Sequence, residues 1–122
     1  NILIVDDSRT TRTVISKTLK LSGIAIGELY QAENGKEALD ILNNNWIDLV
    51  MADINMPVMD GVEMINRMSV DGLLQTIPVV VVSTEGSQTR IEEMRAKGVR
   101  AYIRKPFTPE IIKGIVEDIL GD

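Results

Sequence analysis

The sequence predicts an α/β domain in which a five-stranded parallel sheet is covered by helices on both faces. Five short apolar runs alternate along the chain with segments that carry apolar residues at helical spacing. This alternation implies parallel strand pairing through right-handed crossover connections. The chain has 122 residues, 44% of them hydrophobic and 25% charged, so it can bury a core and is predicted to form one domain over residues 1–122.

The five predicted strands differ in how continuous their apolar character is. They span residues 2–5, 29–32, 49–52, 79–82 and 99–103. The first, third and fourth are uninterrupted, as strands buried on both faces are. Gln31 interrupts the second, and the last alternates polar with apolar residues, so both are predicted to lie at the edges of the sheet. The strand order 2-1-3-4-5 satisfies these positions and defines the flavodoxin-like, doubly wound (βα)5 fold.

Five helices are predicted from apolar residues at helical spacing and from signals at their ends. These apolar positions, helix by helix, are Val14, Ile15 and Leu19; Ala38, Leu39 and Leu42; Val62, Ile65 and Met68; Ile91, Met94 and Ala96; and Ile111, Ile112, Ile115, Val116, Ile119 and Leu120. Asp60 and Thr108 are predicted N-caps, and Gly98 is a predicted stop. The fourth helix has few apolar residues and should be weakly anchored. The aromatic residues Trp46, Tyr30 and Phe107 are interpreted as packing residues.

Composition excludes several classes of function. The chain has no cysteine and no histidine, which excludes disulfides, thiolate metal sites and histidine-based catalysis or phosphohistidine chemistry within it. The net charge of -5 argues against general nucleic-acid binding, and no apolar run is long enough to span a bilayer. We therefore expect a cytoplasmic protein that acts neither on nucleic acid nor in a membrane.

Polar residues follow the strands at the points where the strands end. Asp6 and Asp7 follow the first strand, Asp53 the third, Ser83 the fourth and Lys105 the last. Because the carboxyl ends of parallel strands share one edge of a sheet, these side chains should gather beside the crevice where ligands bind. Three neighbouring carboxylates repel one another and need a counter-charge. Mg²⁺ suits them, since it takes few protein carboxylates and keeps water ligands that a phosphate can replace.

This set of groups indicates phosphoryl transfer. Such chemistry depends mostly on positioning and on neutralising charge, which a divalent cation, a lysine and a hydroxyl can supply. Asp53 would be the nucleophile and would become an aspartyl phosphate.

Four stretches of the chain together resemble a response-regulator receiver domain of the single-domain, chemotaxis type. They are "ILIVDDS", "DLVMADINMPVMDG", "IPVVVVST" and "YIRKPFTPE", and the resemblance covers all 122 residues. An acidic pair or a Lys-Pro pair alone is weak evidence. Four motifs in the same order, each at the end of a strand, are specific.

The resemblance implies a role for each matching residue. Asp53 corresponds to the phosphoacceptor, and the magnesium ligands correspond to Asp6, Asp7, Asp53 and the backbone carbonyl of Asn55, with Asp7 the more direct of the acidic pair. Asn55 also matches one of two positions that tune the lifetime of the phosphoryl group; Glu85 is the other.

A second group of residues matches the switch of the family. Ser83 and Lys105 correspond to the hydroxyl and the amine that bind the phosphoryl group, and the Lys105–Pro106 bond is cis in the family. Tyr102 corresponds to the aromatic residue that turns inward when the hydroxyl moves. Thr84 departs from the pattern, because a smaller residue, usually alanine, is common there.

The resemblance also implies partners. A histidine kinase would donate the phosphoryl group, a downstream target protein would bind the face formed by the fourth helix, last strand and last helix, and a phosphatase is a further partner. The protein would be a monomeric regulator, not an enzyme, that assists its own phosphorylation and dephosphorylation. This face is basic, which favours an acidic patch on the target. Its basic residues are Arg90, Arg95, Lys97, Arg100 and Arg104.

Other interpretations remain open at this point. Singly, Asp7 and Ser8 fit N-caps of the first helix, Asp53 fits a turn, and Lys105 fits a solvated charge. A flavodoxin-like electron carrier would have the same fold, although an acidic pair beside "SRTTRT" would repel a flavin phosphate. A phosphatase of the haloacid-dehalogenase type would need a general acid where Asn55 stands. A pseudo-receiver would bind partners without phosphorylation.

Overall fold

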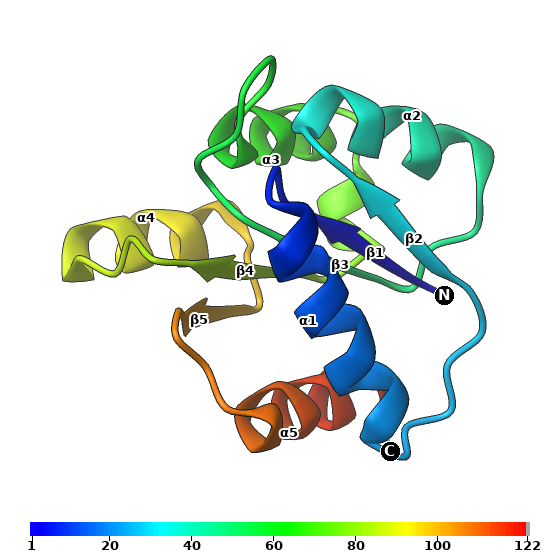
Figure 1. Ribbon diagram of the computed structural model, residues 1–122. Coiled ribbons are helices and arrows are strands. Elements are labelled where there is room, and N and C mark those ends of the chain that lie inside the picture. Colours follow the sequence, from blue (N-terminus) through cyan, green and yellow to red (C-terminus); the bar gives the residue numbers. More distant parts are fainter. Residues whose placement is uncertain (122) are drawn as a thin grey trace.

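The computed structural model describes residues 1–121 and confirms the predicted fold class (Figure 1). Its elements are β1 (Ile2–Val5), α1 (Arg9–Leu21), β2 (Leu29–Ala32), α2 (Gly35–Asn44), β3 (Leu49–Ala52), α3 (Gly61–Val70), a 3₁₀ turn (Leu73–Gln75), β4 (Val79–Ser83), α4 (Gln88–Lys97), β5 (Ala101–Arg104) and α5 (Pro109–Leu120). All neighbouring strands pair in parallel, in the order β2-β1-β3-β4-β5. The last residue of the predicted domain, 122, lies outside the described part.

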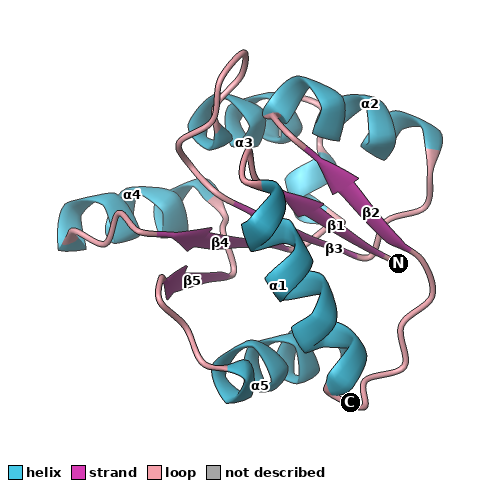
Figure 2. Ribbon diagram, in the orientation of Figure 1, coloured by secondary structure: helices cyan, strands magenta, loops and turns pink. Residues whose placement is uncertain are grey.

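Apolar residues on the two faces of the sheet form two separate cores. Alternate residues of β1 point to opposite sides, so Leu3 belongs to one core and Ile4 to the other. Figure 2 shows α2 and α3 on one side of the sheet and α1 and α5 on the other. Met94 of α4 packs into the first core, and Ile112 of α5 packs into the second. Every residue of β1, β3 and β4 is buried, as the continuous apolar runs predict.

Three strand boundaries differ from the prediction. β4 extends one residue further, to Ser83, and β5 spans Ala101–Arg104 instead of residues 99–103. Val99 cannot open the strand because its amide donates to the carbonyl of Met94 at 3.1 Å, which closes the C-terminus of α4. Val99 is nevertheless buried. The short, partly exposed β2 and β5 lie at the edges, as predicted.

Some predicted interior positions are exposed. The expectation for Trp46 is wrong: its side chain is 79% exposed, and its Nε1 donates to Asp48 Oδ1 at 3.1 Å. The neighbouring Ile47 occupies the buried position instead. In α5, Ile112 and Val116 are buried, whereas the residues at both ends of the predicted stripe lie at the surface.

Each of the five helices begins at a polar N-cap whose side chain accepts a backbone N–H from the first turn. The caps are Ser8, Asn34, Asp60, Ser87 and Thr108. Gly98, in the left-handed region at φ 112°, ends α4 as predicted. No helix within residues 1–121 combines the length and the apolar character needed to cross a bilayer.

Candidate functional site

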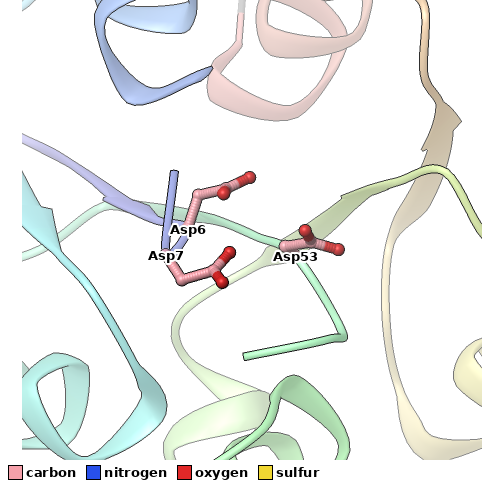
Figure 3. Close-up of side chains that lie close together, drawn as sticks. All are labelled: Asp6, Asp7 and Asp53. Atoms are coloured by element: carbon pink, nitrogen blue, oxygen red, sulfur yellow. The ribbon is translucent and has the colours of Figure 1, made fainter. Parts of the chain in front are cut away.

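Three carboxylates meet where β1 and β3 end (Figure 3). Asp6 and Asp7 directly follow β1, and Asp53 directly follows β3. The parallel ladder continues into this edge, because the Asp53 amide donates to the Val5 carbonyl at 2.9 Å and the Asp6 amide to the Ala32 carbonyl at 3.1 Å. One carboxylate oxygen from each of the three aspartates lies within 4.8 Å of the others. The sequence prediction that distant acids converge is therefore confirmed in geometry.

The acidic pair is divided between the interior and the solvent. Asp6 is only 2% exposed, and its Oδ1 accepts the backbone N–H of Ser8 at 2.8 Å at the start of α1. Its Oδ2 accepts a hydrogen bond from Lys105 Nζ at 2.8 Å. Asp7 is exposed. One acid is thus held rigidly, while its neighbour faces the solvent side of the cluster.

Lys105 joins Asp6 to Asp53. The Lys105 Nζ lies 3.2 Å from Asp53 Oδ2, and Asp53 Oδ1 accepts the amide of Ile54 at 2.7 Å. Burial acts to lower the pKa of Lys105, but the hydrogen bond to Asp6 and the charges of Asp53 and Asp6 outweigh it, so the pKa is raised. The amine therefore stays charged at neutral pH and supplies part of the counter-charge that the carboxylates need.

The loop after Asp53 folds tightly back on itself. The amide of Gly61 donates to the Ile54 carbonyl at 2.7 Å, which brings the start of α3 against the end of β3. A Cβ on Gly61 would lie 2.3 Å from the Asp53 carbonyl oxygen, so only glycine permits this approach. The close packing fixes the backbone of the candidate nucleophile.

The end of β4 holds a buried hydroxyl beside an aromatic residue from β5. Ser83 is fully buried, and its Oγ accepts the amide of Glu85 at 3.2 Å. The hydroxyl of Tyr102 donates to the backbone carbonyl of the same Glu85, and the Tyr102 ring packs against the first core. The Lys105 amide donates to the Ser83 carbonyl at 2.8 Å. Ser83, Tyr102 and Lys105 are thereby connected through one short segment.

The other predicted residues lie on the rim. Asn55, in the loop after β3, is exposed, as is Thr84 after β4. The Lys105–Pro106 peptide bond is cis, as the resemblance implies.

The donor set fits magnesium. Three carboxylates supply hard oxygen ligands close enough together to share one ion. The exposed Asp7 leaves a solvent-facing side where water or a phosphate could complete the coordination.

Sequence reasoning missed two arginines that support this edge. Arg12 is 7% exposed and donates to the Asp6 carbonyl at 2.5 Å and to Gln31 Oε1 at 3.0 Å. The available signal was its helical spacing from the buried Ile15 and Leu19, which places a charge on an apolar stripe. Arg90 was assigned only to a basic surface, but it pairs with Glu85 at 2.9 Å.

Comparison with known proteins identifies the class to which this fold and site belong. The family model described as "Response regulator receiver domain" matches residues 2–117. The chain therefore belongs to the response-regulator receiver family, whose members are regulatory proteins of two-component signalling. Family membership separates it from the electron carrier and phosphatase alternatives.

Within this family the chain is similar to chemotaxis proteins of the CheY type. It is 37% identical over 121 residues to a chemotaxis protein CheY homolog of Campylobacter jejuni, covering 98% of this chain and 92% of the relative. Its structure resembles that of chemotaxis response regulator CheY4 of Vibrio cholerae, with a TM-score of 0.84 and 31% identity over 97% of this chain and 96% of that one.

Another solved structure contains ligands and a second protein. In the CheX-CheY-BeF3-Mg²⁺ complex from Borrelia burgdorferi, the matching chain has a TM-score of 0.87 and 30% identity, over 100% of this chain and 90% of that one.

Proposed function

We propose that this protein is a signalling switch in which Asp53 accepts a phosphoryl group from a histidine kinase. The observation that carries the proposal is the cluster of three carboxylates at one sheet edge, two of them joined by Lys105. A structural ion pair would need only one acid. Three acids around one lysine leave negative charge that a divalent cation can neutralise.

Magnesium would be held by Asp6, Asp7, Asp53 and the backbone carbonyl of Asn55. When bound, the ion supplies charge neutralisation for the oxygens of the incoming phosphoryl group. Asp6 is already held by Ser8 and Lys105, so it orients the site, whereas the exposed Asp7 is free to be the more direct ligand.

Asp53 acts as the nucleophile. One of its carboxylate oxygens attacks phosphorus in line, the bond from phosphorus to the kinase imidazole breaks, and the imidazole leaves. Lys105 neutralises the phosphoryl oxygens, because its raised pKa keeps the amine charged. The protein assists this transfer and the later hydrolysis but has no other substrate, so its role is regulatory.

The new dianion then biases the region around β4 and β5. The Ser83 hydroxyl moves toward the phosphoryl group, which leaves room for Tyr102 and favours the inward arrangement in which its ring packs against the first core. The surface of α4, β5 and α5 changes as a result, which controls binding of a target protein. Phosphorylation thus shifts an existing equilibrium between two arrangements.

The proposed partners follow from the family and the charge of this surface. A histidine kinase donates the phosphoryl group, and a target with an acidic patch binds the α4-β5-α5 face. A phosphatase is a third partner; the Borrelia complex shows a related chain bound to a second protein. Asn55 and Glu85 tune the lifetime of the phosphoryl group. We propose a monomeric, cytoplasmic protein with residues 1–122 as one receiver unit and no nucleic-acid or membrane partner.

Mass spectrometry after treatment with acetyl phosphate and Mg²⁺ tests the proposal. It should find one acid-stable, base-labile phosphoryl group, and peptide mapping should place it on Asp53. A phosphoryl group on another residue, or none under conditions that modify a known receiver domain, would overturn it.

A further inference from the structure

The first turn of α4 carries a charge of the unfavourable sign. Two other helices place a glutamate three residues after the N-cap, Glu37 in α2 and Glu63 in α3, where a negative charge is favoured by the helix dipole. In α4 the N-cap is Ser87, and the third residue after it is Arg90. No acidic residue offsets it in that turn. The unfavourable interaction of the Arg90 charge with the helix dipole must therefore be offset by a favourable contact elsewhere.

That contact is with Glu85. Arg90 Nε donates to Glu85 Oε1 at 2.9 Å, whereas its second acidic neighbour, Glu93, lies at 3.7 Å. The two side chains of the closer pair are 29% and 32% exposed, so solvent screens them only in part. The hydrogen bond to Glu85 is the main cause that raises the pKa of Arg90.

Glu85 is also the residue on which the switch elements converge. Its amide donates to the buried Oγ of Ser83, and its carbonyl accepts the hydroxyl of Tyr102. Burial is the main cause that raises the pKa of Tyr102, followed by the charge of Glu85, and Asp53 contributes in the same direction. The carbonyl of Ser83 accepts the Lys105 amide at 2.8 Å, and the Lys105 amine lies 3.2 Å from Asp53 Oδ2, so the segment that carries Glu85 adjoins the proposed phosphorylation site.

We propose that Arg90 is a positioning residue that holds the Glu85 carboxylate on α4 and neutralises it, which speeds phosphorylation of Asp53. The inference rests on the proposed function and names the control of that same site. An uncompensated Glu85 would repel an anionic phosphoryl donor. Because the pair joins α4 to the β4–α4 segment, an acidic partner that engages Arg90 would release Glu85 and slow the transfer.

The test is the rate of phosphorylation by acetyl phosphate in Arg90→Met, followed by mass spectrometry. We expect a rate about fivefold lower at low ionic strength, as for a partly screened ion pair. Lys20→Met is the matched control, since Lys20 lies exposed on α1, outside the proposed partner-binding face, and forms no ion pair within residues 1–121. Its rate should stay within about twofold of wild type, although the change in net charge is identical.

A double-mutant cycle separates positioning from net charge. In a Glu85→Gln background, Arg90→Met should change the rate less than about twofold, because no carboxylate remains to be held. Arg90→Lys retains the charge and should recover much of the wild-type rate. The fivefold difference should shrink at about 1 M salt. Thermal unfolding of each variant shows whether the protein remains folded. A loss of stability alone would not produce this combination of rate changes in the single and double variants.

Equal rates for Arg90→Met and Lys20→Met would overturn the inference, as would an undiminished Arg90→Met effect in the Glu85→Gln background. Failure of the proposed function is a distinct result, since the wild-type protein itself would then acquire no phosphoryl group on Asp53.

Discussion

The edge of the sheet at which the carboxyl ends of the strands lie has two halves, and they are built differently. At the ends of β1 and β3, both strands are central and fully buried, and Asp6 and Asp53 each accept one backbone N–H and one bond from Lys105. At the ends of β4 and β5, one strand is an edge strand, and the adjacent α4 buries only Met94.

α3 makes the contrast clearer. It has the same length as α4 but buries four residues, including Met64, Ile65 and Met68. A helix held by one buried side chain has little packing to lose when it shifts, so it is suited to respond to a signal. The rigid half of the edge is suited to chemistry, because reacting groups must be fixed. The difference teaches that the proposed chemistry and the proposed response would lie in adjoining regions, one firmly packed and the other weakly packed.

The largest expected effect is on the chemistry itself. Asp53→Asn removes the proposed nucleophile and should abolish phosphorylation by acetyl phosphate, while the circular dichroism spectrum and the thermal unfolding curve show an intact fold. Asp40→Asn, an exposed change on α2, should leave phosphorylation unchanged. Normal incorporation in Asp53→Asn would mean that another residue is the acceptor.

The second largest effect is expected when the link between the two regions is removed. Lys105 directly follows β5, and its amine joins Asp6 to Asp53. Lys105→Ala deletes this amine, so phosphorylation should no longer change the α4-β5-α5 surface. Backbone NMR shifts of α4 and β5 after beryllofluoride addition measure this response. Lys113→Ala, on the exposed side of α5, is the control. A full response in Lys105→Ala would rule out the lysine as the coupling element.

The weak anchoring of α4 can be tested through its single buried side chain. Met94→Ala should lower the free energy of unfolding by about 2–5 kcal/mol, the usual cost of such a cavity. Phosphorylation of Asp53 should persist under conditions where the variant is folded, because the acids stand on other strands. Urea unfolding gives the stability, with the exposed Arg95→Ala expected to change it by less than about 0.5 kcal/mol. A change near zero for Met94→Ala would show that α4 is anchored in another way.

A smaller effect is expected for the exposed acid. Asp7→Ala should weaken magnesium binding by about tenfold, or ~1.4 kcal/mol, since one charged ligand is lost. Stability without magnesium should not fall, because the remaining carboxylates repel each other less. Isothermal titration calorimetry measures the affinity, with Asp118→Ala as a control on α5. Unchanged affinity in Asp7→Ala would remove this residue from the site.

The smallest expected effect is on the pH dependence of stability. The pKa of Lys105 in the folded protein is raised above its ordinary value of 10.5, so its ion pairs stabilise the fold fully below that value. This stabilisation is lost as the pH rises through the raised pKa. Wild type should therefore lose more stability than Lys105→Ala above about pH 10.5. If wild type and Lys105→Ala lost the same amount of stability as the pH rises, this prediction would be contradicted.

The sequence predicts the rigid half of the edge better than the responsive half. Continuous apolar runs identify the central strands, and parallel pairing then brings Asp6, Asp7 and Asp53 together without knowledge of any side-chain direction. The start of β5 was missed because the Val99 amide serves the end of α4 instead. Composition alone cannot distinguish these uses of one backbone group.

Side-chain partners were harder to predict than strand positions. The pairing of Arg90 with Glu85 depends on the path of the β4–α4 segment, and a surface arginine gives no sign of its partner in the sequence. Trp46 was misplaced because large apolar residues are usually buried, whereas a loop turned this one outward beside the buried Ile47.

The most direct test is a two-step NMR titration of the wild-type protein, first with Mg²⁺ and then with beryllofluoride. The first step should shift backbone signals around Asp6, Asp7 and Asp53 only. The second step should extend the shifts to Ser83, Tyr102 and α4. Mg²⁺ that leaves the aspartate signals unmoved, or beryllofluoride that leaves α4 and β5 unmoved, would contradict the division of the edge into a reacting half and a responding half.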